Sequence, residues 1–168
     1  MHKILSAAVA MGLMAAGAAQ AGTTTASFNV TATVLSNCVT SATNLAFPNY
    51  TPGAGAKSGS STISVNCTKG TGYTVALNAG TTTGTAFTQR LLASGANTLQ
   101  YNLFKDAAFT TVFGDGTGSS QTATGTGAGM AAASATSITV YGQLPDSVTN
   151  QAATPGTYAD TITVTVTY

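Results

Sequence analysis

The sequence predicts an all-β protein, and two observations carry this prediction. Apolar and polar residues alternate in short runs separated by turn residues, and the spacing of an amphipathic helix is nowhere sustained. The run at residues 26–34 contains neither Gly nor Pro, and its alternate positions are all apolar: Ala26, Phe28, Val30, Ala32 and Val34. It therefore predicts a strand with one apolar face.

Residues 1–21 have the pattern of an export signal. Lys3 supplies the positive charge, residues 4–18 form an uncharged, Ala-rich run, and Ala19 and Ala21 give the small-x-small pattern of a cleavage site. The apolar run is short for a membrane span. We expect cleavage before Gly22, which leaves a chain of a size suited to one domain with its own core.

The exported chain has few charges, and they balance. It contains four basic residues and four acidic residues: Lys57, Lys69, Arg90, Lys105, Asp106, Asp115, Asp146 and Asp160. Without a basic patch there is no electrostatic reason to expect nucleic acid or an anionic membrane as partner. The single histidine, His2, leaves with the signal, and the sequence has no Glu. Because the usual general base and the commonest metal ligand are missing, we expect no enzyme activity, no cofactor and no metal.

Cys38 and Cys67 are the two cysteines of the chain. In an exported protein such a pair is expected to form a disulfide, which would stabilise the fold by roughly 3 to 4 kcal/mol on the chain-entropy model. The alternative is a reactive thiol, which needs a nearby cation to lower its pKa, and only Lys69 is close in sequence. We therefore predict a disulfide.

The alternating pattern continues along the first half of the exported chain. Apolar positions recur in three runs, at residues 45–50, 63–67 and 73–77. Turn residues follow the first run at 51–55 and the second at 70–72. We expect Cys67 to face the same interior as Ile63 and Val65. We also expect the second and third runs to form a hairpin, followed by a loop at residues 78–84.

The second half of the chain gives fewer strand signals. Residues 99–103 and 138–144 alternate, and Phe109, Val112 and Phe113 lie between them. Residues 114–137 are mostly Gly, Thr, Ser and Ala, which bury too little apolar surface for a rigid core element. We expect a loop, and pairing as a polar strand is the alternative. Its runs GDGTG and GTGAG precede neither a helix pattern nor a Lys, which disfavours a phosphate site.

The last run ends the chain with the cleanest alternation. Ile162, Val164, Val166 and Tyr168 alternate with threonines after a turn at Pro155. About seven strands in the body of the chain, besides the one at residues 26–34, suit an immunoglobulin-like sandwich. A half-buried strand with a Thr-rich outer face is expected near the centre of a sheet, where it needs a neighbour on both sides. The sequence supplies no strand after it.

The order of these motifs resembles the spore coat protein U family, which includes subunits of archaic chaperone–usher pili. The resemblance covers nearly all of residues 22–168. The motifs that carry it are Cys38, Leu45-Ala46-Phe47, Ile63-Ser64-Val65-Asn66-Cys67, Gly72-Tyr73, Leu99-Gln100-Tyr101-Asn102-Leu103, Val140-Tyr141-Gly142 and, as the most specific part, Pro155-Gly156-Thr157-Tyr158-Ala159-Asp160-Thr161 with the strand that follows.

The resemblance implies an incomplete immunoglobulin-like β-sandwich that is completed by donor-strand exchange. In that family an apolar groove lies along the last strand, and the N-terminal strand of a neighbouring subunit fills it by β-strand addition. By position, the donor side chains would be Phe28, Val30, Ala32 and Val34. The acceptor groove would include Ile162, Val164 and Val166, with Tyr168 at its end.

The same resemblance implies a domain plan and partners. Residues 1–21 would be the signal peptide, 22–36 the donor strand and 37–168 the incomplete pilin domain. The subunit would pass through the periplasm with a chaperone, polymerise with copies of itself at an outer-membrane usher, and form an extracellular cell-surface pilus for adhesion or biofilm. Ala32 departs from the pattern, because it fills less of its pocket than Val or Leu would, and we hypothesise that exchange starts there.

Several alternatives remain open from the sequence. Residues 26–34 could be an ordinary first strand of their own domain. The terminal alternation and the final aromatic residue also fit a small outer-membrane β-barrel, although the chain has no Trp and few aromatics. A spore or cyst coat protein is a third alternative. A secreted enzyme is disfavoured, because the aspartates, such as Asp106 and Asp115, are not placed in one cleft by any motif.

Overall fold

The computed structural model describes residues 20–168 of the chain, so most of the expected signal peptide lies outside the described residues. The chain divides into two units, Met1–Thr33 and Val34–Tyr168. Residues 20–33 contain no helix or strand, and their apolar side chains are exposed, Phe28 by 86% and Val30 by 83%. The strand predicted at residues 26–34 is therefore not formed in this structure. None of the helices in residues 20–168 has the length and apolar character needed to cross a membrane.

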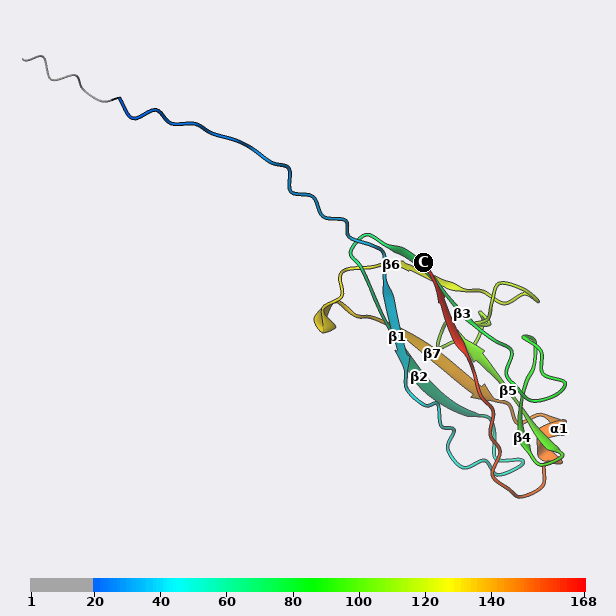
Figure 1. Cartoon of the computed structure of the whole chain (residues 1–168). Coiled ribbons are helices and arrows are strands. Elements are labelled where there is room, and N and C mark those ends of the chain that lie inside the picture. Colours follow the sequence, from blue (N-terminus) through cyan, green and yellow to red (C-terminus); the bar gives the residue numbers. More distant parts are fainter. Residues whose placement is uncertain (1–19) are drawn as a thin grey trace, which may run out of the picture. The chain divides into compact units, whose positions relative to one another are not determined.

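The unit Val34–Tyr168 is an antiparallel β-sandwich, which confirms the predicted fold class (Figure 1). The larger sheet has the order β1-β2-β7-β5-β4 and the smaller one the order β6-β3-β8. The strands are β1 (Cys38–Ala42), β2 (Lys57–Cys67), β3 (Gly72–Leu77), β4 (Arg90–Ser94), β5 (Asn97–Phe104), β6 (Ala123–Thr126), β7 (Thr136–Leu144) and β8 (Val164–Thr167). Two short helices, η1 (Ala132–Ser134) and α1 (Val148–Gln151), lie in the connections.

The core lies between the two sheets and follows the predicted alternation. Ile63, Val65 and Cys67 on β2 are almost completely buried, as expected, and the small sheet contributes Tyr73, Val75 and Leu77 from β3. Cys38 and Cys67 are direct partners in the β1–β2 register and form the expected disulfide. The disulfide thus fixes an edge strand of the large sheet to the strand that supplies much of the core.

The hairpin predicted between residues 63–67 and 73–77 is wrong. β2 belongs to the large sheet, where β1 pairs with one of its edges and β7 with the other. Because both edges of β2 are occupied, β3 cannot pair with it. The chain instead crosses to the small sheet between Cys67 and Gly72, and Gly70 N–H donates to the carbonyl of Gly127 on the way.

The loop predicted at residues 114–137 is only partly present, because the alternative, a polar strand, forms within it and Thr136 and Ser137 already belong to β7. Ala123–Thr126 forms β6, which pairs with the free edge of β3 from Gly72 to Val75. Main-chain pairing needs no large apolar side chains. Within β6, Gly125 is required because a side chain at this position would overlap the ring of Tyr73. The polar composition of this segment therefore gave no signal for β6, which covers the free edge of β3. The strand β4 and the helix α1 were also not predicted.

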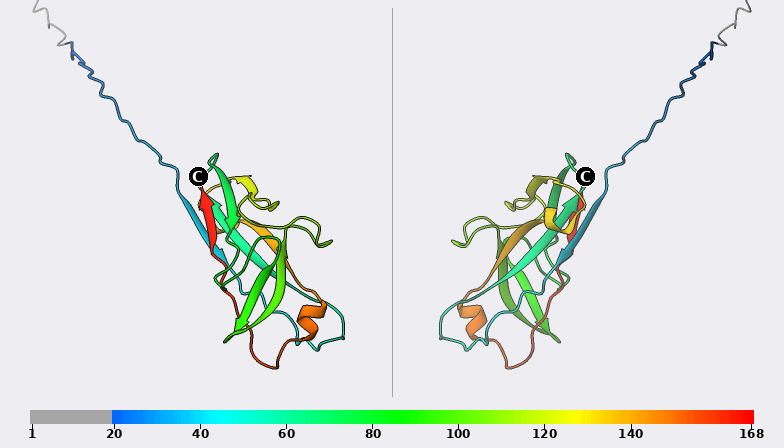
Figure 2. Two further views of the ribbon diagram at one scale, coloured as in Figure 1. Left: turned by 90° about the vertical axis from the view of Figure 1, so that its right-hand side faces the viewer. Right: turned by 90° about the vertical axis from the view of Figure 1, so that its left-hand side faces the viewer.

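The last strand lies at an edge of its sheet, whereas the sequence pattern predicted a central position. Within residues 34–168, β8 pairs with β3 alone. β8 and the edge strand β1 of the large sheet lie next to each other in both figures of the whole chain (Figures 1 and 2). The two sheets of the sandwich thus present their edge strands on the same side.

Candidate functional site: a groove along the open side of the sandwich

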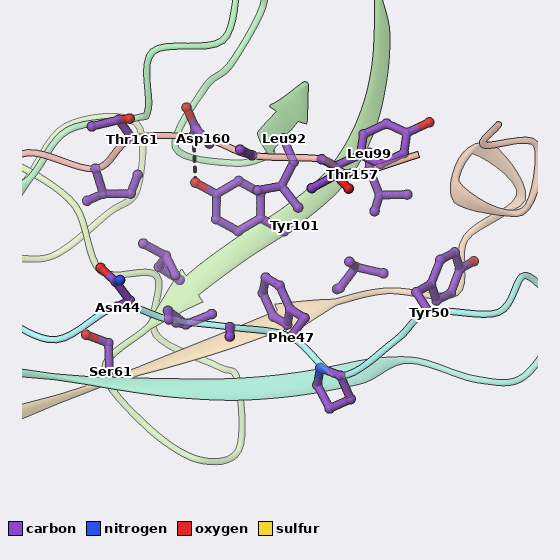
Figure 3. Close-up of a pocket in the computed structure, with 18 of the residues that line it drawn as sticks. Asn44, Phe47, Tyr50, Ser61, Leu92, Leu99, Tyr101, Thr157, Asp160 and Thr161 are labelled. Carbon is purple, nitrogen blue, oxygen red and sulfur yellow. Dashed lines mark hydrogen bonds between the residues drawn. The ribbon is translucent and has the colours of Figure 1, made fainter. Parts of the chain in front are cut away.

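A groove with a cavity of about 1180 Å³ opens between the two sheets (Figure 3). Its floor consists of core side chains from both sheets: Ile63, Leu77, Leu92, Leu99, Tyr101, Leu103, Val140 and Leu144. Two segments outside the strands form its sides, and we call them the first wall (residues 43–52) and the second wall (residues 153–162). The groove is therefore apolar at its base and bordered by chain that belongs to no sheet.

Beyond Thr43, the first wall rests on the large sheet without pairing with it. The side chains of Leu45 and Phe47 are half-buried and pack against the core. The wall can approach closely because Gly59 and Gly142 lie beneath it, and a Cβ on Gly59 would come within 2.7 Å of the Ala46 carbonyl oxygen. Residues 44–49 make no main-chain hydrogen bond to another described residue. Their N–H and C=O groups are available to a strand that enters the groove.

The two ends of the first wall are fixed by polar contacts. At its start, Thr43 N–H donates to the Thr62 carbonyl at 3.0 Å. At its far end, the Asp146 carboxylate accepts the Tyr50 hydroxyl at 2.5 Å and the N–H groups of Gly53 and Gly55 at 3.1 and 2.8 Å. These bonds, that of Tyr50 first, hold the pKa of Asp146 below its usual range. Burial and the same contact raise the pKa of Tyr50 to about 12.

The second wall is attached to both sheets. Ala159 exchanges two main-chain hydrogen bonds with Ala93 on β4, at 2.8 and 3.0 Å. Asp160 follows, and its carboxylate accepts the Tyr101 hydroxyl at 2.7 Å and the Thr81 N–H at 2.9 Å. Thr163 N–H then donates to the side chain of Asn78 at 2.9 Å, one residue before β8 begins. The second wall thus crosses from the edge of the large sheet to the edge of the small one.

The Asp160–Tyr101 pair is the central polar contact of the groove (Figure 3). Partial burial acts to raise the pKa of Asp160, but the hydrogen bonds from Tyr101 and Thr81 outweigh it and the pKa lies below its usual range. Burial, supported by the carboxylate, raises the pKa of Tyr101 strongly. The Tyr101 ring packs edge-to-face with Phe47 of the first wall, with ring centroids 6.1 Å apart. Tyr101 therefore contacts both walls.

The structure brings only part of the predicted acceptor set to the groove. Ile162 and Val164 line the cavity, whereas Val166 packs against the core beside it and Tyr168 is 56% exposed. The predicted donor side chains Phe28, Val30, Ala32 and Val34 are all exposed. The donor and acceptor roles of these residues stay predictions. Sequence reasoning missed the contribution of the first wall, although its alternating Leu45 and Phe47 gave a signal.

Comparison with known proteins extends this description. No curated protein sequence matches the chain. A crystal structure of the CsuC–CsuE chaperone–tip adhesion subunit pre-assembly complex, from the archaic chaperone–usher Csu pili of Acinetobacter baumannii, contains a chain with the same fold. The match has a TM-score of 0.56 and 23% sequence identity over 81% of this chain. It covers 41% of that chain, so this protein spans about two fifths of its length.

The family comparison covers most of the sequence. Residues 24–165 match the Spore Coat Protein U domain, which includes both walls of the groove and residues 26–34. The protein therefore belongs to the Spore Coat Protein U domain family.

Proposed function

We propose that the protein is a structural subunit of a chaperone–usher pilus. In this proposal residues 26–34 of one copy enter the groove of the next copy as an additional strand, and repetition of this joint builds a fibre. The single observation that carries the proposal is the groove itself. It combines an apolar floor with residues 44–49 of the first wall and with the outer edge of β8, the strand that follows the second wall. The main-chain groups of residues 44–49 and of this edge have no partner within residues 34–168.

The segment 26–34 has the properties that such a groove selects. Its alternate apolar side chains are exposed, and polar Ser, Asn and Thr residues stand between them. An inserted strand would place one set on the floor and leave the other toward solvent. No charged residue occurs between residue 22 and Lys57, so insertion would bury no charge.

The energies are sufficient for a stable joint. Burial of Phe28, Val30 and Val34 contributes roughly 5 to 8 kcal/mol from apolar area. Each main-chain hydrogen bond to a wall adds about 0.5 to 1.5 kcal/mol. The second copy is the natural source of the strand, because every copy carries both the segment and the groove and such head-to-tail contacts continue indefinitely.

The proposal includes partners and a location. A groove of this kind would need protection before assembly, so we include a periplasmic chaperone that covers it and an outer-membrane usher at which copies are joined. The fibre would be extracellular, and the protein would act as a structural component and not as an enzyme. The membership in the Spore Coat Protein U domain family and the fold shared with a chain from a pilus complex support this assignment.

The test compares two valines of similar exposure. Val30 is 83% exposed in the proposed donor segment, and Val148 is 85% exposed on α1. The proposal predicts that the purified exported chain forms a ladder of detergent-resistant oligomers. We expect Val30→Asp to abolish this ladder, because a carboxylate cannot be buried in the groove. Val148→Asp serves as the matched control and should leave the ladder intact. Unchanged polymerisation of the Val30→Asp variant would contradict the proposal.

A further inference from the structure

The two walls of the groove need an external support. Neither wall forms a strand, and the second wall pairs with a sheet only through Ala159 and Ala93. Both walls carry apolar side chains toward a cavity whose exposed surface would shrink if they moved together. We propose that Asp146 and Asp160 are positioning residues that hold the walls at the separation a strand requires. This inference rests on the proposed function, since it concerns how the groove receives its strand.

Asp146 supports the first wall from a rigid base. It lies between β7 and α1, where the completely buried Asn150 fixes the chain to β5 through hydrogen bonds with both main-chain groups of Gln100 and with the Pro145 carbonyl. From this base the Asp146 carboxylate reaches Tyr50 and two main-chain N–H groups just beyond the wall. The wall is thereby tied to a point outside the cavity.

Asp160 supports the second wall in the corresponding way. Besides the Tyr101 hydroxyl from β5, its carboxylate accepts the N–H groups of Thr81 and Thr82 at 2.9 and 3.3 Å, from the loop that follows β3. Gly80 makes room for the carboxylate, because a side chain at that position would overlap it. One carboxylate therefore joins the second wall to both sheets.

Asp146 and Asp160 make the same kind of contact at the groove. Each accepts one tyrosine hydroxyl, from Tyr50 or Tyr101, and both tyrosines line the cavity. Asp106 provides the comparison. Its carboxylate accepts N–H groups of residues 108, 110 and 111 within its own loop, and none of these residues lines the cavity. Asp106 thus has the same chemistry without a role at a wall.

The test measures strand entry directly. The acceptor is the full exported chain carrying Val30→Asp, so that its own segment cannot serve as donor, and the probe is a fluorescent synthetic peptide of residues 24–36. We expect Asp146→Asn and Asp160→Asn each to slow peptide association about tenfold. Each substitution removes a charge-assisted hydrogen bond that holds a wall open, and the free energy of such a bond corresponds to a rate change of about this size. Asp106→Asn is the matched control and should keep the association rate within about twofold.

The dissociation rate separates positioning from general stability. Once the peptide is seated, its own hydrogen bonds hold the walls, so dissociation from the Asp146→Asn and Asp160→Asn chains should equal that from the unaltered acceptor. A change confined to dissociation, or equal association rates in all variants, would overturn the inference. Tyr50→Phe and Tyr101→Phe remove only a hydroxyl and should show the same effect on association, which keeps the test decisive if an Asn variant does not fold.

Failure of the proposed function gives a different result. If the peptide does not bind the acceptor that keeps all four aspartates, the groove is not a strand-binding site and the pilus proposal falls. If the peptide binds that acceptor, only the comparison among variants decides the roles of Asp146 and Asp160.

Discussion

Gly59 of β2 lies directly opposite Gly142 of β7, and the first wall of the groove rests on this pair. A Cβ on Gly59 would come within 2.7 Å of the main-chain oxygen of Ala46, whereas one on Gly142 would meet Leu45 Cδ1 at 2.8 Å and Phe47 Cζ at 3.0 Å. Two glycines in register thus form a flat area on the sheet where another segment can lie.

The first prediction follows from the kind of atom each Cβ would meet. Gly59→Ala pushes against main chain that cannot rotate away, so we expect it to lower the free energy of unfolding by about 1–3 kcal/mol and to weaken peptide binding in the groove. Gly142→Ala meets the ends of flexible side chains and should have a smaller effect. Chemical denaturation measures both, with the exposed Ser60→Ala as control. Equal stability of Gly59→Ala and the unaltered chain would refute this account.

The second prediction concerns Arg90, whose side chain is completely buried and has no carboxylate among its hydrogen-bond partners in residues 20–168. Its guanidinium donates to Asn102 Oδ1 at 2.6 Å and to the carbonyls of Asn78 and Phe113 at 2.9 and 2.7 Å, which joins β5 to the end of β3. Burial lowers its pKa.

Because Arg90→Met leaves the buried carbonyl of Phe113 and the partly buried carbonyl of Asn78 without their donor, we expect a loss of about 3 kcal/mol in the free energy of unfolding. Arg90→Lys should also destabilise, since one ammonium group cannot reproduce the planar fork. Denaturant titration gives both values. The exposed Lys69→Met serves as control and should stay within about 0.5 kcal/mol. A stable Arg90→Met chain would show that the carbonyls of Asn78 and Phe113 find other donors.

The third prediction concerns the disulfide, which joins residues separated by 29 positions. A loop of that length gives roughly 3 to 4 kcal/mol on the chain-entropy model. We therefore expect the double variant Cys38→Ser with Cys67→Ser to unfold at a lower denaturant concentration by that difference. Treatment of the unaltered chain with a reductant should reproduce the shift and leave the double variant unchanged. A shift in the double variant under reductant would point to another cause.

The sequence predicted the core strands because their alternation is independent of context. Ile63, Val65 and Cys67 face the core under any arrangement of the sheets. The prediction from sequence failed where the structure depends on which strands pair with each other. β3 was assigned to β2 because the two are adjacent in sequence, but the edges of β2 were already taken by β1 and β7. β6 has almost no apolar side chains, and only the free edge of β3 makes it a strand.

The candidate site was predicted in the same uneven way. Ile162 and Val164 were found from the periodicity of the last strand, and they line the cavity. The contacts of Asp146 with Tyr50 and of Asp160 with Tyr101 join residues 96 and 59 positions apart. Asp146 beside Pro145 predicts a turn, but no local pattern shows which distant hydroxyl either aspartate will meet.

The fourth prediction concerns acid. The pKa values of Asp146 and Asp160 lie below the usual range in the folded chain, and hydrogen bonds from Tyr50 and Tyr101 contribute to this. A lowered pKa adds stability above the pKa of the unfolded chain, about 4, and this stability is lost as the pH falls through the lowered values. We expect the free energy of unfolding to fall below about pH 4, and to fall less steeply in Asp160→Asn. An equally steep fall in that variant would assign the effect to the three aspartates that remain, Asp106, Asp115 and Asp146, whose pKa values are also lowered.

The fifth prediction tests Ala32 as the weak point of the proposed joint. Ala32→Val adds two methyl groups on the face that would enter the groove, and their burial is worth about 1.5 kcal/mol. If exchange begins where the strand fills the groove least, this change should slow replacement of a bound strand about tenfold. The measurement is the rate at which excess labelled peptide displaces an unlabelled Ala32→Val peptide from the acceptor chain.

The neighbouring Thr33 provides the control for this measurement. Thr33→Val places the same valine side chain on the polar face of the same strand, which would point away from the groove floor. Its displacement rate should therefore match that of the unaltered peptide. If Ala32→Val and Thr33→Val are displaced at the same rate, Ala32 does not set the start of exchange. If only Thr33→Val slows displacement, the opposite face of residues 26–34 meets the floor and the donor side chains must be reassigned.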